Sequence, residues 1–134
     1  MEKPVTVIES PYAAQEEKDL LRNINYARAC MKDSFERGEI PFASHLLYTQ
    51  PGILDDNIKE ERNKGIEAGF YLADNVADII AVYTDLGITK GMKKGIENWK
   101  EKGKNLEYRA LGDGWVKEFY EMSRRHSHSG IWGL

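Results

Sequence analysis

The sequence predicts an α/β domain in which a small parallel sheet carries helices on both faces. The main observation is the order of the chain, where short β-branched or apolar runs alternate with longer segments of helical spacing. A second observation is that the segment 41–48 is mainly apolar, as in strands that are buried on both faces. The length of 134 residues, with 41% hydrophobic and 31% charged residues, suits one domain over 1–134 with a single core.

The first strand is expected over Val5–Glu9, a β-branched run followed by Ser10-Pro11-Tyr12, where the proline disfavours further strand pairing. A helix is expected from about 15 to 37, and Gly38 suits its end. Its buried face is predicted from apolar residues at helical spacing, namely Leu20, Ile24, Ala27, Met31 and Phe35.

The second strand is predicted over 41–48, between Pro41 and the turn pair Pro51-Gly52. The length of this segment alone leaves a single helical turn open as an alternative.

The next helix is expected to begin at a cap formed by Asp55 or Asp56 and to run to about residue 73. Gly65 and Gly69 lie one turn apart in it and would permit close approach to a neighbouring element. The side chains that this helix is predicted to bury are Ile66, Phe70 and Ala73.

The clearest strand of the sequence is 78–83, which is rich in β-branched residues. Thr89 is then expected to cap a helix over 90–102 that Gly103 closes. A fourth strand is predicted over 106–111.

The C-terminal stretch is expected to hold a helix over 115–124 within an aromatic tail at about 112–134. The tail would cover the chain's own core or dock on a second subunit, because aromatic residues are enriched at interfaces. A protein that uses this tail only to bind other proteins is therefore one open function class.

Composition excludes several other classes. The 19 Lys and Arg against 22 Asp and Glu give a net charge of −3 without a basic block, so we expect no nucleic-acid partner. The single cysteine, Cys30, allows neither an internal disulfide nor a multi-cysteine zinc site, and we expect no metal and no cofactor. No apolar run reaches the ~18 residues of a spanning helix, so we expect no membrane partner and a cytoplasmic location.

The strongest candidate site is the run 83–92, where a strand ends and a helix begins. Ligands of parallel α/β sheets collect at the carboxyl ends of strands, and the free amides of a helix start attract anions. We therefore expect anion contacts from Thr89, Lys90, Gly91 and Lys93, and contacts from Asp85 to ribose hydroxyls or a base. The structural alternatives are that Thr89 only caps the helix, that Gly91 only packs, and that Asp85 only shapes a turn.

The walls of this site are expected to come from neighbouring strand ends. Ser10, Pro11 and Tyr12 would surround a nucleoside with a hydroxyl, open amides and an aromatic ring, although Ser-Pro also opens ordinary turns. His45 and Tyr83 are predicted pocket walls. His45 has no serine or cysteine partner at a recognisable spacing, so a structural role is favoured over that of a base.

Other polar groups have ordinary explanations. His126 and His128 alone make a weak case for a metal site, because no further ligands are identifiable near them. Glu60, Glu61 and Glu67 fall on a helix rich in charge, where a solvated face is the default interpretation.

The order of elements, with Ser10-Pro11-Tyr12 after the first strand and Gly91-Met92 at a helix start, resembles the nucleoside 2-deoxyribosyltransferase-like superfamily. More narrowly, the phrases Ala-Ser-His-Leu-Leu-Tyr-Thr-Gln-Pro-Gly over 43–52 and Tyr-Thr-Asp-Leu-Gly-Ile over 83–88 resemble an uncharacterised bacterial and phage family near it. The resemblance covers about residues 5–111. It implies a flavodoxin-like, Rossmann-like domain that binds nucleosides or nucleotides, usually as a homo-oligomer.

Enzymes of that superfamily cleave N-glycosidic bonds with a glutamate in a Gly-Met-Glu-Leu-Gly-like helix start. The corresponding run here is Gly91-Met92-Lys93-Lys94-Gly95, so Lys93 stands at the position of the nucleophile. An ammonium group cannot capture the sugar as a carboxylate does. We therefore expect non-catalytic binding of a nucleotide-derived small molecule, in its narrowest form by a phage sponge that sequesters an ADP-ribose-type or cyclic-nucleotide immune signal.

The enzymatic alternative is an N-glycosidase or deoxyribosyltransferase acting on nucleosides or nucleotides. In that case a one-turn shift of the alignment would leave Asp85 or Glu97 in the catalytic role.

Overall fold

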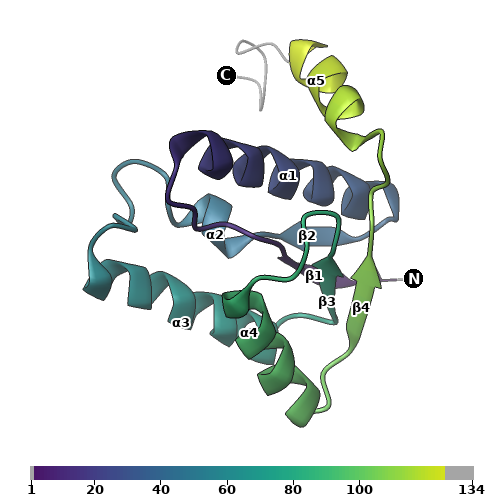
Figure 1. Ribbon diagram of the computed structural model, residues 1–134. Helices are drawn as coiled ribbons and strands as arrows, with labels where there is room; N and C mark the ends of the chain where they lie inside the picture. The colour runs from purple at the N-terminus through teal and green to yellow at the C-terminus, as the bar shows by residue number, and fades with distance from the viewer. Residues whose placement is uncertain (1, 126–134) are drawn as a thin grey trace.

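The computed structural model describes residues 2–125, which form a parallel four-stranded sheet of order β2-β1-β3-β4 (Figure 1). The strands are β1 (Val5–Glu9), β2 (Ile40–Phe42), β3 (Ile79–Tyr83) and β4 (Leu106–Arg109). Every neighbouring pair is parallel, with Thr6 opposite Ile79 and Tyr83 opposite Arg109. The predicted α/β class is confirmed, and the arrangement is consistent with a small flavodoxin-like fold.

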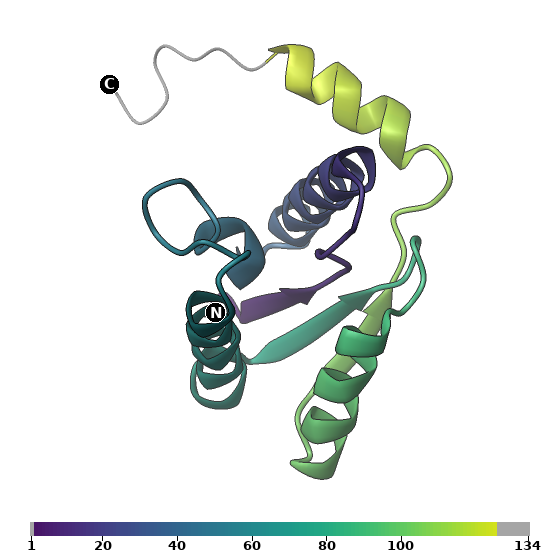
Figure 2. The same ribbon diagram turned by 60° about the vertical axis from the view of Figure 1, so that its left-hand side comes forward.

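Helices cover both faces of this sheet. They are α1 (Glu17–Glu36), the single turn α2 (Ser44–Leu47), α3 (Lys59–Asn75), α4 (Lys90–Glu101) and α5 (Trp115–Arg125). Figure 2 shows α1 and α5 on one side of the sheet and α3 and α4 on the other. Because the strand order reverses between β1 and β3, the crevice at the carboxyl ends of these two strands is where ligands of such sheets bind.

Alternating side chains of β1 enter two separate cores. Val7 packs with Ala73, Ile80 and Trp99 under α3 and α4. The next residue, Ile8, packs on the opposite face with a cluster that includes Tyr26, Cys30 and Tyr83. The central residues of β1 are therefore buried on both faces of the sheet, which suits its β-branched composition.

The buried face of α1 differs from the prediction. Phe35 is 58% exposed, and several buried positions of the helix are polar. Asn23 is buried because its Nδ2 donates to the carbonyl oxygen of Tyr12 at 2.8 Å, and the Ser34 hydroxyl donates to Glu39 at 2.7 Å. Such partners compensate for the loss of contact with water, so polar residues can lie on the buried face. The face predicted from apolar residues alone is therefore rotated about the helix axis relative to the observed buried face.

The predicted strand over 41–48 is wrong beyond Phe42. The carbonyl oxygen of Ala43 accepts hydrogen bonds from the amides of Leu46 and Leu47 at 3.1 and 3.2 Å, which closes the turn α2. Helix α3 lies close to it at Gly69, where a Cβ atom would be only 2.8 Å from Ser44 Oγ. The close approach expected of this glycine is confirmed.

The start of α3 also differs from the prediction. The helix begins at Lys59, and its N-cap Ile58 makes no side-chain hydrogen bond. Asp55 accepts a bond from the amide of Asn57 at 2.9 Å and so shapes the preceding turn instead. Ala73 is fully buried as predicted, whereas Ile66 is 46% exposed.

The expectations for α4 are confirmed at its start, because Thr89 Oγ1 accepts from the amide of Met92 at 3.2 Å. Strand β4 ends at Arg109, two residues before the predicted end. Across residues 2–125, no helix combines the length and the apolar character needed to cross a membrane. The tail beyond residue 125, including His126, His128 and Trp132, lies outside the described residues.

Candidate ligand-binding site

A cavity of about 430 Å³ lies at the carboxyl end of β1, between α2, α3 and the start of α4. Its volume is within the usual range for small-molecule sites. The walls combine aromatic, small and polar residues, chiefly Glu9, Ser10, Tyr12, His45, Tyr48, Thr49, Gly65, Gly69, Phe70, Thr89, Lys90, Gly91, Gly95 and Trp99.

The structure brings six of the predicted site residues together in this lining, from three separate segments of the chain. They are Ser10, Tyr12, His45, Thr89, Lys90 and Gly91. Pro11, Tyr83, Asp85, Lys93 and Glu97 are not part of the lining.

His45 is held in place by short polar and aromatic contacts. Its Nε2 lies 3.2 Å from Ser10 Oγ, and its ring meets that of Tyr12 edge-on with centroids 5.2 Å apart. Tyr12 donates to Thr49 Oγ1 at 2.9 Å, and Thr49 in turn donates to the carbonyl oxygen of His45. Burial lowers the pKa of His45 to about 4, so the imidazole is neutral at pH 7 and acts as a hydrogen-bonding wall.

The first turn of α4 presents unused donors to the cavity. Thr89 accepts from Met92 with its side chain and from Lys93 with its carbonyl oxygen. The amides of Lys90 and Gly91 donate to no other residue within 2–125. A Cβ atom added at Gly91 would meet no atom within 4 Å, so the backbone is open on this side.

Glu9 is a cavity residue that sequence reasoning missed. Strand alternation places its side chain on the same face as Val7, under α3 and α4. Its carboxyl group has no hydrogen bond or ion pair with any other described residue, and burial raises its pKa to about 8. The available signal was a charged residue that ends a strand of otherwise β-branched residues.

Asp85 connects distant segments of the fold and does not line the cavity, contrary to the prediction. Its carboxylate accepts from the Tyr26 hydroxyl at 2.5 Å and from the amides of Leu111 and Gly112 at 2.8 and 3.0 Å. Burial alone would raise the pKa of Asp85, but these hydrogen bonds outweigh it and hold the pKa below its usual value. The carboxylate therefore ties the end of β3 to α1 and to the chain after β4.

Tyr83, Lys93 and Glu97, like Pro11, are also placed away from the cavity. Tyr83 is fully buried toward α1, where it donates to Asp33 at 2.7 Å. Lys93 and Glu97 lie on the exposed side of α4, because Met92, Gly95, Ile96 and Trp99 form its buried side.

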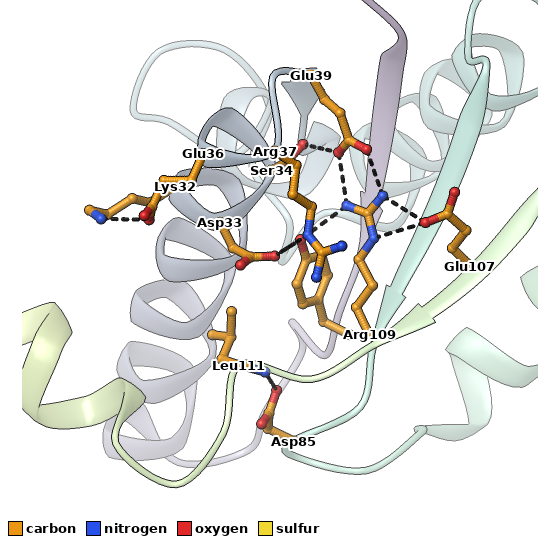
Figure 3. Close-up of polar contacts among 11 residues, drawn as sticks. Lys32, Asp33, Ser34, Glu36, Arg37, Glu39, Asp85, Glu107, Arg109 and Leu111 are labelled. Atoms are coloured by element: carbon orange, nitrogen blue, oxygen red, sulfur yellow. Dashed lines mark hydrogen bonds and ion pairs between the residues drawn. The ribbon is translucent and has the colours of Figure 1, made fainter.

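A buried ion pair joins opposite edges of the sheet (Figure 3). Arg109 at the end of β4 contacts both carboxylate oxygens of Glu39, which precedes β2, at 2.7 and 2.8 Å. Their side chains are only 3% and 7% exposed. The Arg109 guanidinium, helped by the Ser34 hydroxyl, holds the pKa of Glu39 below its usual range. This network supports the fold and does not reach the cavity.

A second hollow of about 690 Å³ adjoins the cavity along the loop after α2. The two share Tyr12, Thr49 and Arg62 in their walls, so a longer ligand has room to continue outward. Among residues 2–125, no three His, Cys, Asp or Glu side chains are grouped so that they could hold a metal ion.

Comparison with known proteins gives one family match. The family model described as a domain of unknown function (DUF7768) matches residues 4–109, from just before β1 to the end of β4. No curated protein matches the chain.

Proposed function

We propose that the chain, which belongs to the DUF7768 family, binds a nucleotide-derived small molecule in the cavity at the end of β1 and does not turn it over. The observation that carries this proposal is the cavity itself, which lies where the strand order reverses. It combines the amides at the start of α4, which have no acceptor within residues 2–125, with polar and aromatic walls. Phosphate groups bind at such helix starts because the free amides and the helix dipole both favour an anion.

The walls suit the remaining parts of a nucleotide. Tyr12, Tyr48, Phe70 and Trp99 supply aromatic surface for a base. Ser10, neutral His45 and Glu9 supply hydrogen-bonding groups for hydroxyls or base edges. Lys90 adds a positive charge near the amides of the α4 start.

The proposal of binding without turnover is supported by the positions of the residues considered for catalysis. Under the resemblance to nucleoside 2-deoxyribosyltransferases, Lys93 stands where those enzymes carry a nucleophile, and neither Lys93 nor the alternatives Asp85 and Glu97 line the cavity. Homo-oligomer formation and a role as a phage sponge for an immune signal remain predictions from the same resemblance.

The test is to incubate excess protein with nucleosides, mononucleotides, NAD, ADP-ribose and cyclic nucleotides, and to follow the free pool by chromatography. We expect one compound to be depleted and recovered intact after heat denaturation. Gly91→Phe should abolish depletion, because Gly91 lines the cavity and the added side chain meets no protein atom within 4 Å of its Cβ. The control Lys100→Ala, at an exposed position near the other end of α4, should leave depletion unchanged. No depletion of any compound would overturn the proposal.

A specific observation also keeps the enzymatic alternative in view. Asp85 and Glu97 lie outside the cavity lining, but Glu9 places a carboxyl group inside it, and carboxyl groups serve as acids in glycosidic cleavage. An N-glycosidase or deoxyribosyltransferase would release free base in amounts exceeding the protein in the same chromatograms. Glu9→Gln would then abolish the release.

A further inference from the structure

Glu9 and the start of α4 lie on the same face of the sheet. Glu9 lies opposite Val82 in the pairing of β1 with β3, so both side chains point to the same face. Val82 packs in turn against Met92 and Ile96 of α4. The first turn of α4 therefore covers the same face of the sheet that carries the Glu9 side chain, and both line the cavity.

The Glu9 carboxyl group and the first turn of α4 line the same cavity, but they have opposite effects on a bound anion. The amides of Lys90 and Gly91 have no acceptor within residues 2–125 and favour a bound anion. An ionised Glu9 in the same cavity would repel that anion in a setting of low dielectric. A protonated Glu9 would instead offer an O–H donor to it.

We infer that an anionic group of the ligand binds at the first turn of α4 beside Glu9, and that it binds only while Glu9 holds a proton. This inference rests on the proposed function and extends it to the ligand's charge and to the control of its binding. Burial, which raises the pKa of Glu9 to about 8, keeps most of the carboxyl groups protonated at neutral pH. Binding is then coupled to proton uptake above that pH.

Other charged and titratable groups line the cavity from each surrounding element. They are Tyr12 after β1, His45 of α2, Tyr48 and Asp56 of the following loop, Glu61 and Arg62 of α3, and Lys90 of α4. Burial keeps the pKa of His45 near 4, so this imidazole stays neutral throughout the alkaline range. The remaining groups are unchanged in a Glu9→Gln variant, which makes that variant the matched comparison.

The test uses sulfate, a dianion that does not change charge in this range, added to the full chain between pH 7 and 9.5. Amide NMR shifts of Lys90 and Gly91 report its binding. We expect the wild-type affinity to fall at least tenfold from pH 7 to 9.5, and the affinity of Glu9→Gln to change less than threefold. Glu101→Gln removes one exposed carboxylate at the far end of α4 and should follow the wild type.

Equal pH dependence in the wild type and Glu9→Gln would overturn the inference, and so would the absence of sulfate shifts at Lys90 and Gly91. If the nucleotide panel identifies a ligand but sulfate binding shows no coupling, only this inference fails. If the panel is negative and sulfate binding is coupled, the nucleotide proposal fails while the coupling of an anion to Glu9 is supported.

Discussion

Two acidic residues near the carboxyl ends of neighbouring strands show how much a single side chain depends on its donors. Asp85, just after β3, receives three hydrogen bonds and is held as a carboxylate. Glu9, at the end of β1, has no donor among the described residues, and its burial favours the protonated form. Two residues of similar chemistry thus have different roles: Asp85 connects distant segments, and Glu9 lines the cavity.

Removing Arg109 should be severely destabilising, because it leaves the Glu39 carboxylate buried without its partner. We expect Arg109→Met to lower the free energy of unfolding by about 3–5 kcal/mol, measured by urea denaturation. Glu107→Gln is the control: its side chain is 43% exposed, and the same guanidinium contact should contribute only about 0–1 kcal/mol. Similar small losses in both variants would show that the pair does not support the fold.

Asp85→Ala should loosen the connection after β4. The amides of Leu111 and Gly112 would lose their acceptor, and we expect a loss of about 1–3 kcal/mol in unfolding free energy. Hydrogen exchange at these two amides should accelerate. The neighbouring exposed Asp113→Ala should leave both rates unchanged, and equally slow exchange in Asp85→Ala would contradict the assignment.

At the scale of an element, the two glycines at the ends of α4 should respond in opposite directions. Gly91 has ordinary helical backbone and open space where a methyl group would be added, so Gly91→Ala should stabilise by up to ~1 kcal/mol. Gly103 follows the helix with a φ of +69°, where alanine is strained, so Gly103→Ala should destabilise by about 1 kcal/mol. Thermal unfolding of the two variants would check this, and a loss in both would contradict the open space at Gly91.

For the whole molecule, Glu9 should make stability fall as the pH rises from about 4.5 to about 8. Its pKa is 4.5 ordinarily and about 8 in the folded chain, so the folded state binds the proton more tightly. The resulting stabilisation is complete below pH 4.5 and is lost as the pH rises to about 8. Glu9→Gln should therefore gain stability relative to the wild type between pH 5 and 8, measured by urea denaturation, and a constant difference would refute the assignment.

The pKa of His45 shifts in the opposite direction, so its titration lowers stability at acidic pH. Its pKa falls from 6.5 to about 4 on burial, so the neutral imidazole stabilises the fold above pH 6.5 and this contribution is lost as the pH falls toward 4. Glu9→Gln removes only the Glu9 titration, so the loss of stability that comes from His45 should persist in this variant.

The sequence by itself determined the α/β class, the approximate positions of β1, β3 and β4, and the cap of α4, because these follow from local patterns of β-branched runs, helical spacing and a capping threonine. It also pointed to the start of α4 and to Ser10, Tyr12 and His45, since strand ends are readable along the chain. Only the tertiary structure decided which strand ends share a cavity, and that Asp85 and Arg109 are bound to partners 26 and 70 residues away. It alone revealed Glu9 as a half-buried carboxyl group in the cavity without a partner among the described residues, because exposure and hydrogen-bond partners are set by packing between distant segments.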